Sequence, residues 1–209
     1  MSERISLLSL CLISLFVISS VAVLAEVSVG VKEGDWIEYD VSYTGSAPNE
    51  YPKWARIEIT NIQGTSITAD LTVERLDGTS DTNSGTFDLK TGVLDLLLIP
   101  ADLDVGDDFY HKDFGNITIA GKEEHSYAGG KRTVIYATID QTALHWDKTT
   151  GILLQSDQSA DNFTQKFLAV KTNMWQAQIF GLKPTIFYVL IVAILAIIAL
   201  VAVFLLKRR

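Results

Sequence analysis

The alternation of apolar and polar residues in three stretches decides the fold. Residues 37–43 read IEYDVSY, residues 67–74 read ITADLTVE, and residues 134–139 read VIYATI. Apolar side chains at every second position are typical of a β-strand with one buried face and one face in water. The stretches are also rich in Val, Ile, Thr and Tyr, which fit a pleated surface. They therefore predict strands of an antiparallel sheet.

Glycine-containing turn signals separate these stretches. They are Gly64, Asp77-Gly78, Gly129-Gly130 and Gly151. Short strands divided by such turns predict an all-β antiparallel domain of roughly eight to ten strands, either a sandwich or a curved half-barrel. Residues 96–99 read LLLI and precede Pro100. We expect them to form a buried strand that ends at the proline.

An eight-residue pattern occurs twice, 59 residues apart. Residues 87–94 read FDLKTGVL and residues 146–153 read WDKTTGIL, so both follow aromatic-Asp-x-x-Thr-Gly-aliphatic-Leu. We expect a hairpin loop at each copy, with the Asp accepting backbone N–H bonds and the Gly in the left-handed conformation.

A Gly-Asp pair also opens a predicted strand twice, at residues 34–35 and 106–107. Together with the two hairpins, these pairs are consistent with two related halves, 34–94 and 106–153. The alternative is that unrelated hairpins use the same turn chemistry.

The two ends of the chain are apolar and indicate a membrane. Residues 5–25 carry no charge and end in Val-Leu-Ala, so residues 1–25 predict a secretory signal peptide, with an uncleaved anchor as the alternative. Residues 185–206 are 22 consecutive uncharged residues. A helix of this length spans about 33 Å, which exceeds a hydrocarbon core of about 30 Å.

These ends predict an oriented, single-pass protein of the cell membrane whose partner is the lipid bilayer, through residues 185–206. Residues 26–172 form the extracellular β domain, residues 173–184 a stalk, and residues 207–209, which read KRR, a cytoplasmic tip. This orientation follows from the rule that positive residues stay inside.

The charge of the central part excludes one class of partner. Residues 26–184 contain 13 Lys and Arg against 24 Asp and Glu, a net charge of −11. Nucleic-acid binding by phosphate neutralisation needs a basic face, so no nucleic-acid partner is expected. The same charge argues against a domain that lies flat on an anionic lipid surface.

Four motifs carry a resemblance to other proteins. Residues 34–39 read GDWIEY, residues 99–107 read IPADLDVGD, residues 127–132 read YAGGKR, and residues 146–153 read WDKTTGIL. In these motifs the chain resembles archaeal single-pass surface proteins with a signal peptide, a β-rich outer domain and a C-terminal membrane helix. The resemblance implies this architecture and brings no activity to any residue.

Three groups of residues are candidates for sites. An aromatic sheet face is the candidate for ligand binding: Tyr39, Tyr43, Trp54 and Trp146. Aspartates before a predicted strand are the candidate for weak Ca²⁺ binding, with a solvated turn as the alternative: Asp102, Asp104, Asp107 and Asp108. Two Asn-x-Thr sequons are the candidates for glycosylation: Asn116 and Asn162.

The expected function is binding or structural interaction at the cell surface, without catalysis and without a cofactor other than Ca²⁺. The alternatives are an accessory subunit of a membrane complex, with a protein partner, and a carrier of a lipid or small ligand. A hydrolase is less favoured, because the sequence contains no nucleophile elbow, phosphate loop or dinucleotide fingerprint.

Overall fold

The fold is an antiparallel β domain followed by one helix. The computed structural model describes residues 27–93, 95–159, 162–179 and 181–207, with side chains up to Leu200. The strands are β1 (Trp36–Gly45), β2 (Pro52–Gln63), β3 (Ser66–Arg75), β4 (Ser80–Asp88), β5 (Asp108–His111), β6 (Gly115–Thr118), β7 (Gly121–Tyr127), β8 (Gly130–Ile139), β9 (Thr142–Asp147), β10 (Leu153–Ser159) and β11 (Phe163–Thr172). The helix is α2 (Pro184–Lys207).

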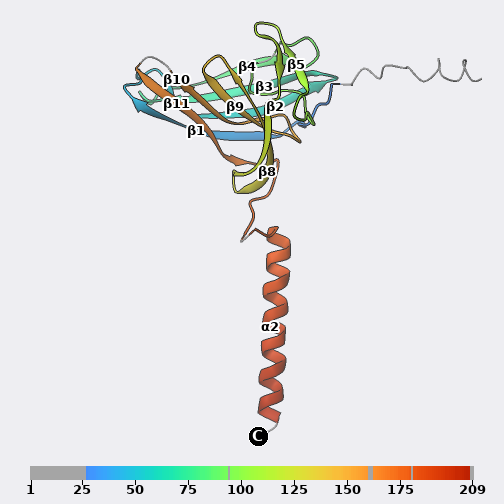
Figure 1. Ribbon diagram of the computed structural model, residues 1–209. Coiled ribbons are helices and arrows are strands. Elements are labelled where there is room, and N and C mark those ends of the chain that lie inside the picture. Colours follow the sequence, from blue (N-terminus) through green and yellow to red (C-terminus); the bar gives the residue numbers. More distant parts are fainter. Residues whose placement is uncertain (1–26, 94, 160–161, 180, 208–209) are drawn as a thin grey trace, which may run out of the picture.

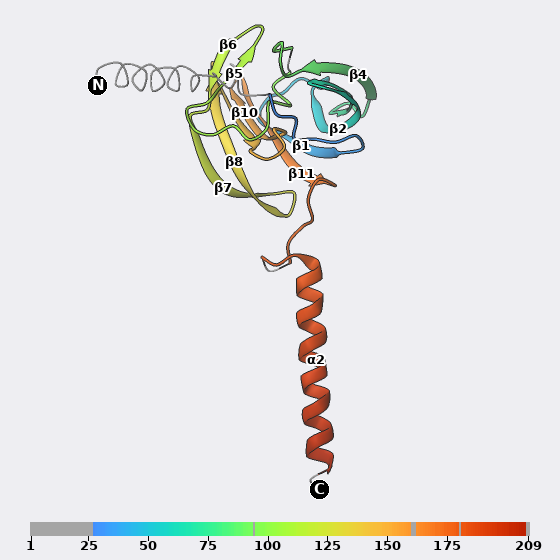
Figure 2. The same ribbon diagram turned by 90° about the vertical axis from the view of Figure 1, so that its right-hand side faces the viewer.

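Nine strands form one sheet in the order β4-β3-β2-β1-β11-β10-β9-β8-β7, and β5 and β6 form a small separate sheet. The large sheet consists of two meanders, β1–β4 and β7–β11, joined where the first strand pairs with the last. It is curved and does not close into a barrel, as its two ends in Figures 1 and 2 show. The predicted all-β antiparallel fold is confirmed.

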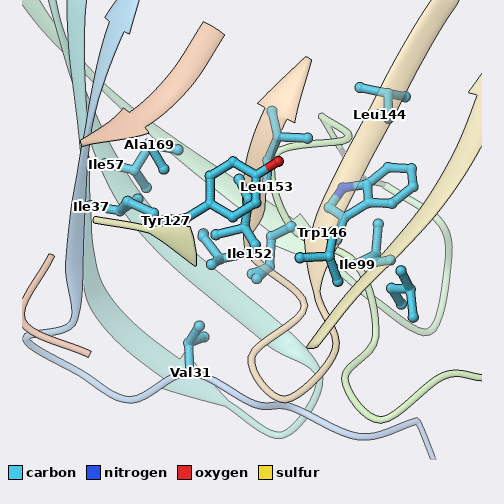
Figure 3. Packing of buried hydrophobic residues seen from close by; sticks show 14 of the residues in the cluster. Val31, Ile37, Ile57, Ile99, Tyr127, Leu144, Trp146, Ile152, Leu153 and Ala169 are labelled. Atoms are coloured by element: carbon cyan, nitrogen blue, oxygen red, sulfur yellow. The ribbon is translucent and has the colours of Figure 1, made fainter. Parts of the chain in front are cut away.

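One face of the sheet, here called the inner face, carries the core. Strand alternation places Ile37 and Tyr39 on this face, opposite Ile57 and Ala55 of β2, and all four side chains are buried. Trp146 is fully buried in the same cluster (Figure 3). Burying apolar surface contributes about 25 cal/mol per Å², so this face supplies most of the stability.

The prediction of a strand at residues 96–99 is wrong. Leu96 has a φ of 52°, which is outside the extended region, and only Leu98 forms a β-bridge, with Ile152. Trp146 Nε1 donates a hydrogen bond of 2.7 Å to the Leu96 carbonyl and holds this conformation. An apolar run is compatible with any buried segment, and here tertiary contacts bend it across the inner face.

The two Gly-Asp turns have the same hydrogen bonds. Gly34 N–H donates to the Ile59 carbonyl (2.8 Å), and Ile59 N–H donates to the Asp35 carbonyl (2.8 Å). In the second copy, Gly106 N–H donates to Ile119 (3.0 Å), which donates to Asp107 (2.9 Å). Each Asp also accepts the N–H three residues before it. The repeated Gly-Asp pair in the sequence therefore corresponds to a repeated pattern of backbone hydrogen bonds.

The helix α2 extends away from the domain and is reached through the stalk (Figure 1). It begins at Pro184, a residue that is favoured in the first turn because its missing N–H would have no partner there. Within the residues described with their side chains, no helix is both long and apolar enough to cross a membrane. The predicted signal peptide, residues 1–25, and the last two residues of the tip lie outside the described residues.

Candidate functional site

The larger candidate site is a half-open cavity of about 660 Å³ on the inner face. Its floor is formed by Leu144, Ser156 and Phe167, which the strand register places side by side on β9, β10 and β11. The remaining walls come from the segment 95–97, the β8–β9 turn, the tip of the β5–β6 hairpin and both ends of β10: Asp95, Leu96, Leu97, Phe114, Ile139, Asp140, Gln141, Thr142, Leu153, Gln158 and Ser159.

A smaller cavity of about 320 Å³ lies on the same face, over β1, β2 and β3. Its lining is mainly apolar, with one acid and one base: Tyr39, Glu50, Pro52, Ala55, Ile57, Leu71, Val73, Arg75, Leu97 and Phe167. The Arg75 guanidinium forms an ion pair of 2.5 Å with Asp81. An apolar chamber of this kind suits a hydrocarbon group.

Leu97 and Phe167 line both cavities, so these two side chains lie at the boundary between them. The backbone of the segment is held at Leu97 and at Ile99. Leu153 N–H donates to the Leu97 carbonyl at 2.9 Å, and Ile99 N–H donates to the Gly151 carbonyl at 3.0 Å.

The larger cavity contains acidic groups and no basic side chain among its lining residues. Loss of solvent around the Asp95 carboxyl raises its pKa, and the nearby His111 lowers it in part, although Asp95 still reaches the surface. Asp140 lies in the β8–β9 turn with a φ of 53°. The polar side of this cavity therefore suits hydroxyl groups or a cation better than an anion.

Two of the predicted ligand-binding aromatics, Tyr39 and Tyr43, extend from β1 on the inner face. Tyr39 lines the smaller cavity, and its hydroxyl donates a hydrogen bond of 2.8 Å to the Leu153 carbonyl. Burial raises the pKa of this phenol. Tyr43, four residues further along β1, donates at 2.6 Å to the Pro52 carbonyl and packs against Phe163.

The other two are not part of a shared binding face. Trp54 pairs with Asp40 and follows the alternation of Arg56, so it lies on the opposite face from Ala55. Trp146 is on the inner face but is fully buried, and it contacts Phe109 edge to face. Its role is to hold the segment that bounds the larger cavity.

The aspartate cluster forms turns and ion pairs. Asp104 accepts hydrogen bonds from Lys122 (2.8 Å) and Lys148 (3.1 Å), and these bonds, that of Lys122 first, hold its pKa well below the usual range. Asp107 accepts the Asp104 N–H at 2.7 Å, and Asp108 accepts the Thr118 hydroxyl at 2.6 Å.

Asp102 lies in the left-handed conformation, with a φ of 62°, and its carbonyl accepts Lys148 Nζ. Nowhere in the described part of the chain do three acidic, His or Cys side chains come together as a metal-binding group. The carboxylates of Asp104, Asp107 and Asp108 accept hydrogen bonds from lysines, a backbone N–H group and a hydroxyl, and Ca²⁺ binding by this cluster stays a prediction.

Both sequons are accessible. Asn116 is exposed on β6, while the neighbouring Ile117 is buried, as the alternation requires. Asn162 is exposed at the start of β11. The side chains are thus placed where a glycan could be attached, and their modification stays a prediction.

Sequence reasoning missed the two boundary residues, Leu97 and Phe167. Phe167 begins a run of four apolar residues, 167–170, and its place opposite Val41 follows only from the strand pairing. Leu97 lies in the run at 96–99, where four adjacent apolar residues give no alternation from which a facing direction could be read.

Comparison with known proteins yields little. No protein-family model matches the chain, and no curated protein matches it. Among solved structures, the chain is similar to a siderocalin, Ex-FABP, described as functioning through dual ligand specificities. The identity is 12%, the match covers 67% of this chain and 74% of that one, and the TM-score is 0.27. A likeness at this level carries no argument about ligand or function.

Proposed function

We propose that this chain is a membrane-anchored surface protein whose outer domain binds a small amphipathic ligand on the inner face of its sheet. The observation that carries the proposal is the pair of adjoining cavities that share Leu97 and Phe167. The larger one is within the range of about 300–1,000 Å³ that is common for small-molecule sites.

The chemistry of the two chambers defines the ligand class. The smaller chamber suits a hydrocarbon chain, because its walls are mostly aliphatic and aromatic. The larger one adds Asp95, Asp140, Gln158 and Ser159 to a mainly apolar floor and suits a hydroxylated or cationic head group. A ligand that lies across Leu97 would place its tail in one chamber and its head in the other.

The proposed anchor is the C-terminal segment. Residues 185–206 are uncharged and are followed by three basic residues. Side chains of α2 such as Val189, Val192 and Leu200 are more than half exposed, which in water is costly and in a bilayer is favourable. We therefore propose the cell membrane as the location, with the β domain outside.

We also infer that the domain is built from two related halves. This inference is supported by the backbone hydrogen bonds, which are the same at the two Gly-Asp turns and the same at the two hairpins 88–93 and 147–152. In both hairpins the Asp N–H donates to the carbonyl five residues later, and the Gly N–H donates back to the Asp carbonyl.

The test is to identify what the full chain carries when it is purified from native membranes. We expect mass spectrometry of a denatured extract to show a stoichiometric amphiphile. Ser156→Trp fills the floor of the larger cavity and should remove it, whereas Ser42→Trp, on an exposed position of β1, should not. Equal amounts in wild type and Ser156→Trp would contradict the proposal.

A further inference from the structure

A separate cavity of about 300 Å³ lies where the stalk meets the turn between β7 and β8. This turn is the part of the β domain on the side of α2, as both views show (Figures 1 and 2). The cavity is lined by three basic residues, two amides, an indole and a glycine: Lys131, Arg132, Lys183, Gln176, Gln178, Trp175 and Gly130.

The walls of this cavity, here called the junction pocket, are held by specific contacts. Gln178 N–H donates to the Gly129 carbonyl at 2.7 Å, and Trp175 Nε1 donates to the Tyr127 carbonyl at 3.1 Å. A Cβ on Gly130 would lie 2.5 Å from Trp175 Cδ1. The YAGGKR motif therefore carries a glycine here so that the stalk can dock on the turn.

The three basic residues of the junction pocket differ in how firmly their side chains are held. The Arg132 guanidinium lies 4.6 Å from the Trp175 ring centre and binds the fully buried Asp147 through Nε at 2.6 Å, so it forms a fixed wall. Lys131 has one exposed ion pair, with Glu124 at 3.4 Å, which is worth little in water. Lys183 forms no ion pair with any described residue.

The charge of the junction pocket is opposite to that of the domain. Residues 26–184 have a net charge of −11, yet no carboxylate lines this pocket. Its two exposed ammonium groups and two side-chain amides are donors that suit phosphate oxygens. Lys183 directly precedes Pro184, the first residue of α2, so the pocket opens where lipid head groups would lie.

We propose that the junction pocket binds the phosphate of an anionic lipid head group in the adjoining leaflet. This rests on the proposed membrane anchoring. The lipid orders the junction between domain and helix, because its phosphate contacts Lys131 on the turn and Lys183 on the stalk. The indole of Trp175 packs beside the glycerol region, as aromatic rings do at membrane interfaces.

The test uses the full chain in nanodiscs of phosphatidylcholine with added phosphatidylglycerol. Native mass spectrometry measures the ratio of the two lipids retained by the chain. We expect a preference for phosphatidylglycerol that falls about fivefold for each lysine removed in Lys131→Gln and Lys183→Gln. The control is Lys53→Gln with Lys90→Gln, which removes the same charge at exposed positions elsewhere and should leave the ratio unchanged.

The remaining outcomes separate the possible failures. A chain that leaves the nanodisc in high salt would overturn both the anchoring and the lipid site. A chain that stays but shows no lipid preference, or the same preference in both double variants, would overturn the lipid site alone. The last measurement adds inorganic phosphate to discs of pure phosphatidylcholine and follows the change in tryptophan emission that Trp175→Phe abolishes. Saturation by free phosphate without a lipid preference would make the pocket a free-anion site and would overturn the lipid site.

Discussion

The hairpins at residues 88–93 and 147–152 share a backbone and differ in their surroundings. Their glycines, Gly92 and Gly151, have φ values of 73° and 71°, and their Asp N–H bonds are 2.8 and 2.9 Å long. Asp88 is half-buried at the end of the edge strand β4 and bonds mainly to its own loop. Asp147 is fully buried between β9 and β10 and holds Arg132 through both carboxylate oxygens.

The shape of the turn comes from residues within the hairpin, whereas its contribution to stability depends on residues outside it. The shared residues are sufficient for the same loop at the edge and in the middle of the sheet. The Arg132 partner comes from β8, outside the hairpin, and converts a turn residue into part of a buried ion pair. The following changes test how far the two copies are equivalent.

The largest difference is expected at the aspartates. Asp147→Asn removes the charge that compensates Arg132 and should lower the free energy of unfolding by about 3 kcal/mol. Asp88→Asn removes only loop hydrogen bonds and should cost about 0.5–1 kcal/mol. Urea unfolding followed by tryptophan emission measures both. Equal losses would show that the surroundings of Asp147 add nothing to the turn.

The glycines come next. Gly→Ala in the left-handed conformation costs about 1–2 kcal/mol at either site. At Gly151 the new Cβ would also overlap the Ile99 carbonyl, whereas at Gly92 it would lie 2.6 Å from the ring and 2.7 Å from the carbonyl oxygen of the exposed Tyr110, a less severe overlap. We expect Gly151→Ala to lower the thermal midpoint more than Gly92→Ala. The reverse order would place the rigid environment at the edge hairpin.

The Gly-Asp turns should behave alike. Asp35 accepts the Lys32 N–H at 2.8 Å, and Asp107 accepts the Asp104 N–H at 2.7 Å, and both turns are exposed. Asp35→Ala and Asp107→Ala should each cost about 1 kcal/mol, the usual net contribution of one hydrogen bond. Urea unfolding of the two variants gives the comparison, and a difference of more than twofold would argue against related halves.

The smallest effect is a dependence on pH at the edge hairpin. The Lys90 N–H bond, followed by bonds from Thr65 and Thr91, lowers the pKa of Asp88. A carboxyl with a lowered folded-state pKa adds stability that is present above its unfolded pKa of about 3.9 and is lost as the pH falls through the folded value. In acid titrations of stability, Asp88→Asn should therefore show a shallower decline than wild type. An unchanged slope would mean that these bonds do not favour the ionised form.

Much of the fold follows from the sequence, because strand alternation and turn residues are local signals. Even the position of Trp54 could have been read, since it shares the parity of Arg56 and Glu58 and is out of phase with Ile57. The bent conformation of the segment at 96–99 could not have been predicted from the sequence. Its shape depends on a hydrogen bond from Trp146, which lies 50 residues away.

The sequence by itself determined the strands with clear alternation, the two matching hairpins, the two Gly-Asp turns and the C-terminal helix, since each depends on residues a few positions apart. Only the tertiary structure decided the pairing of β1 with β11, the cavities on either side of Leu97 and the junction pocket. These features require side chains from distant segments to meet, and one chain carries no periodic signal for which segments will do so.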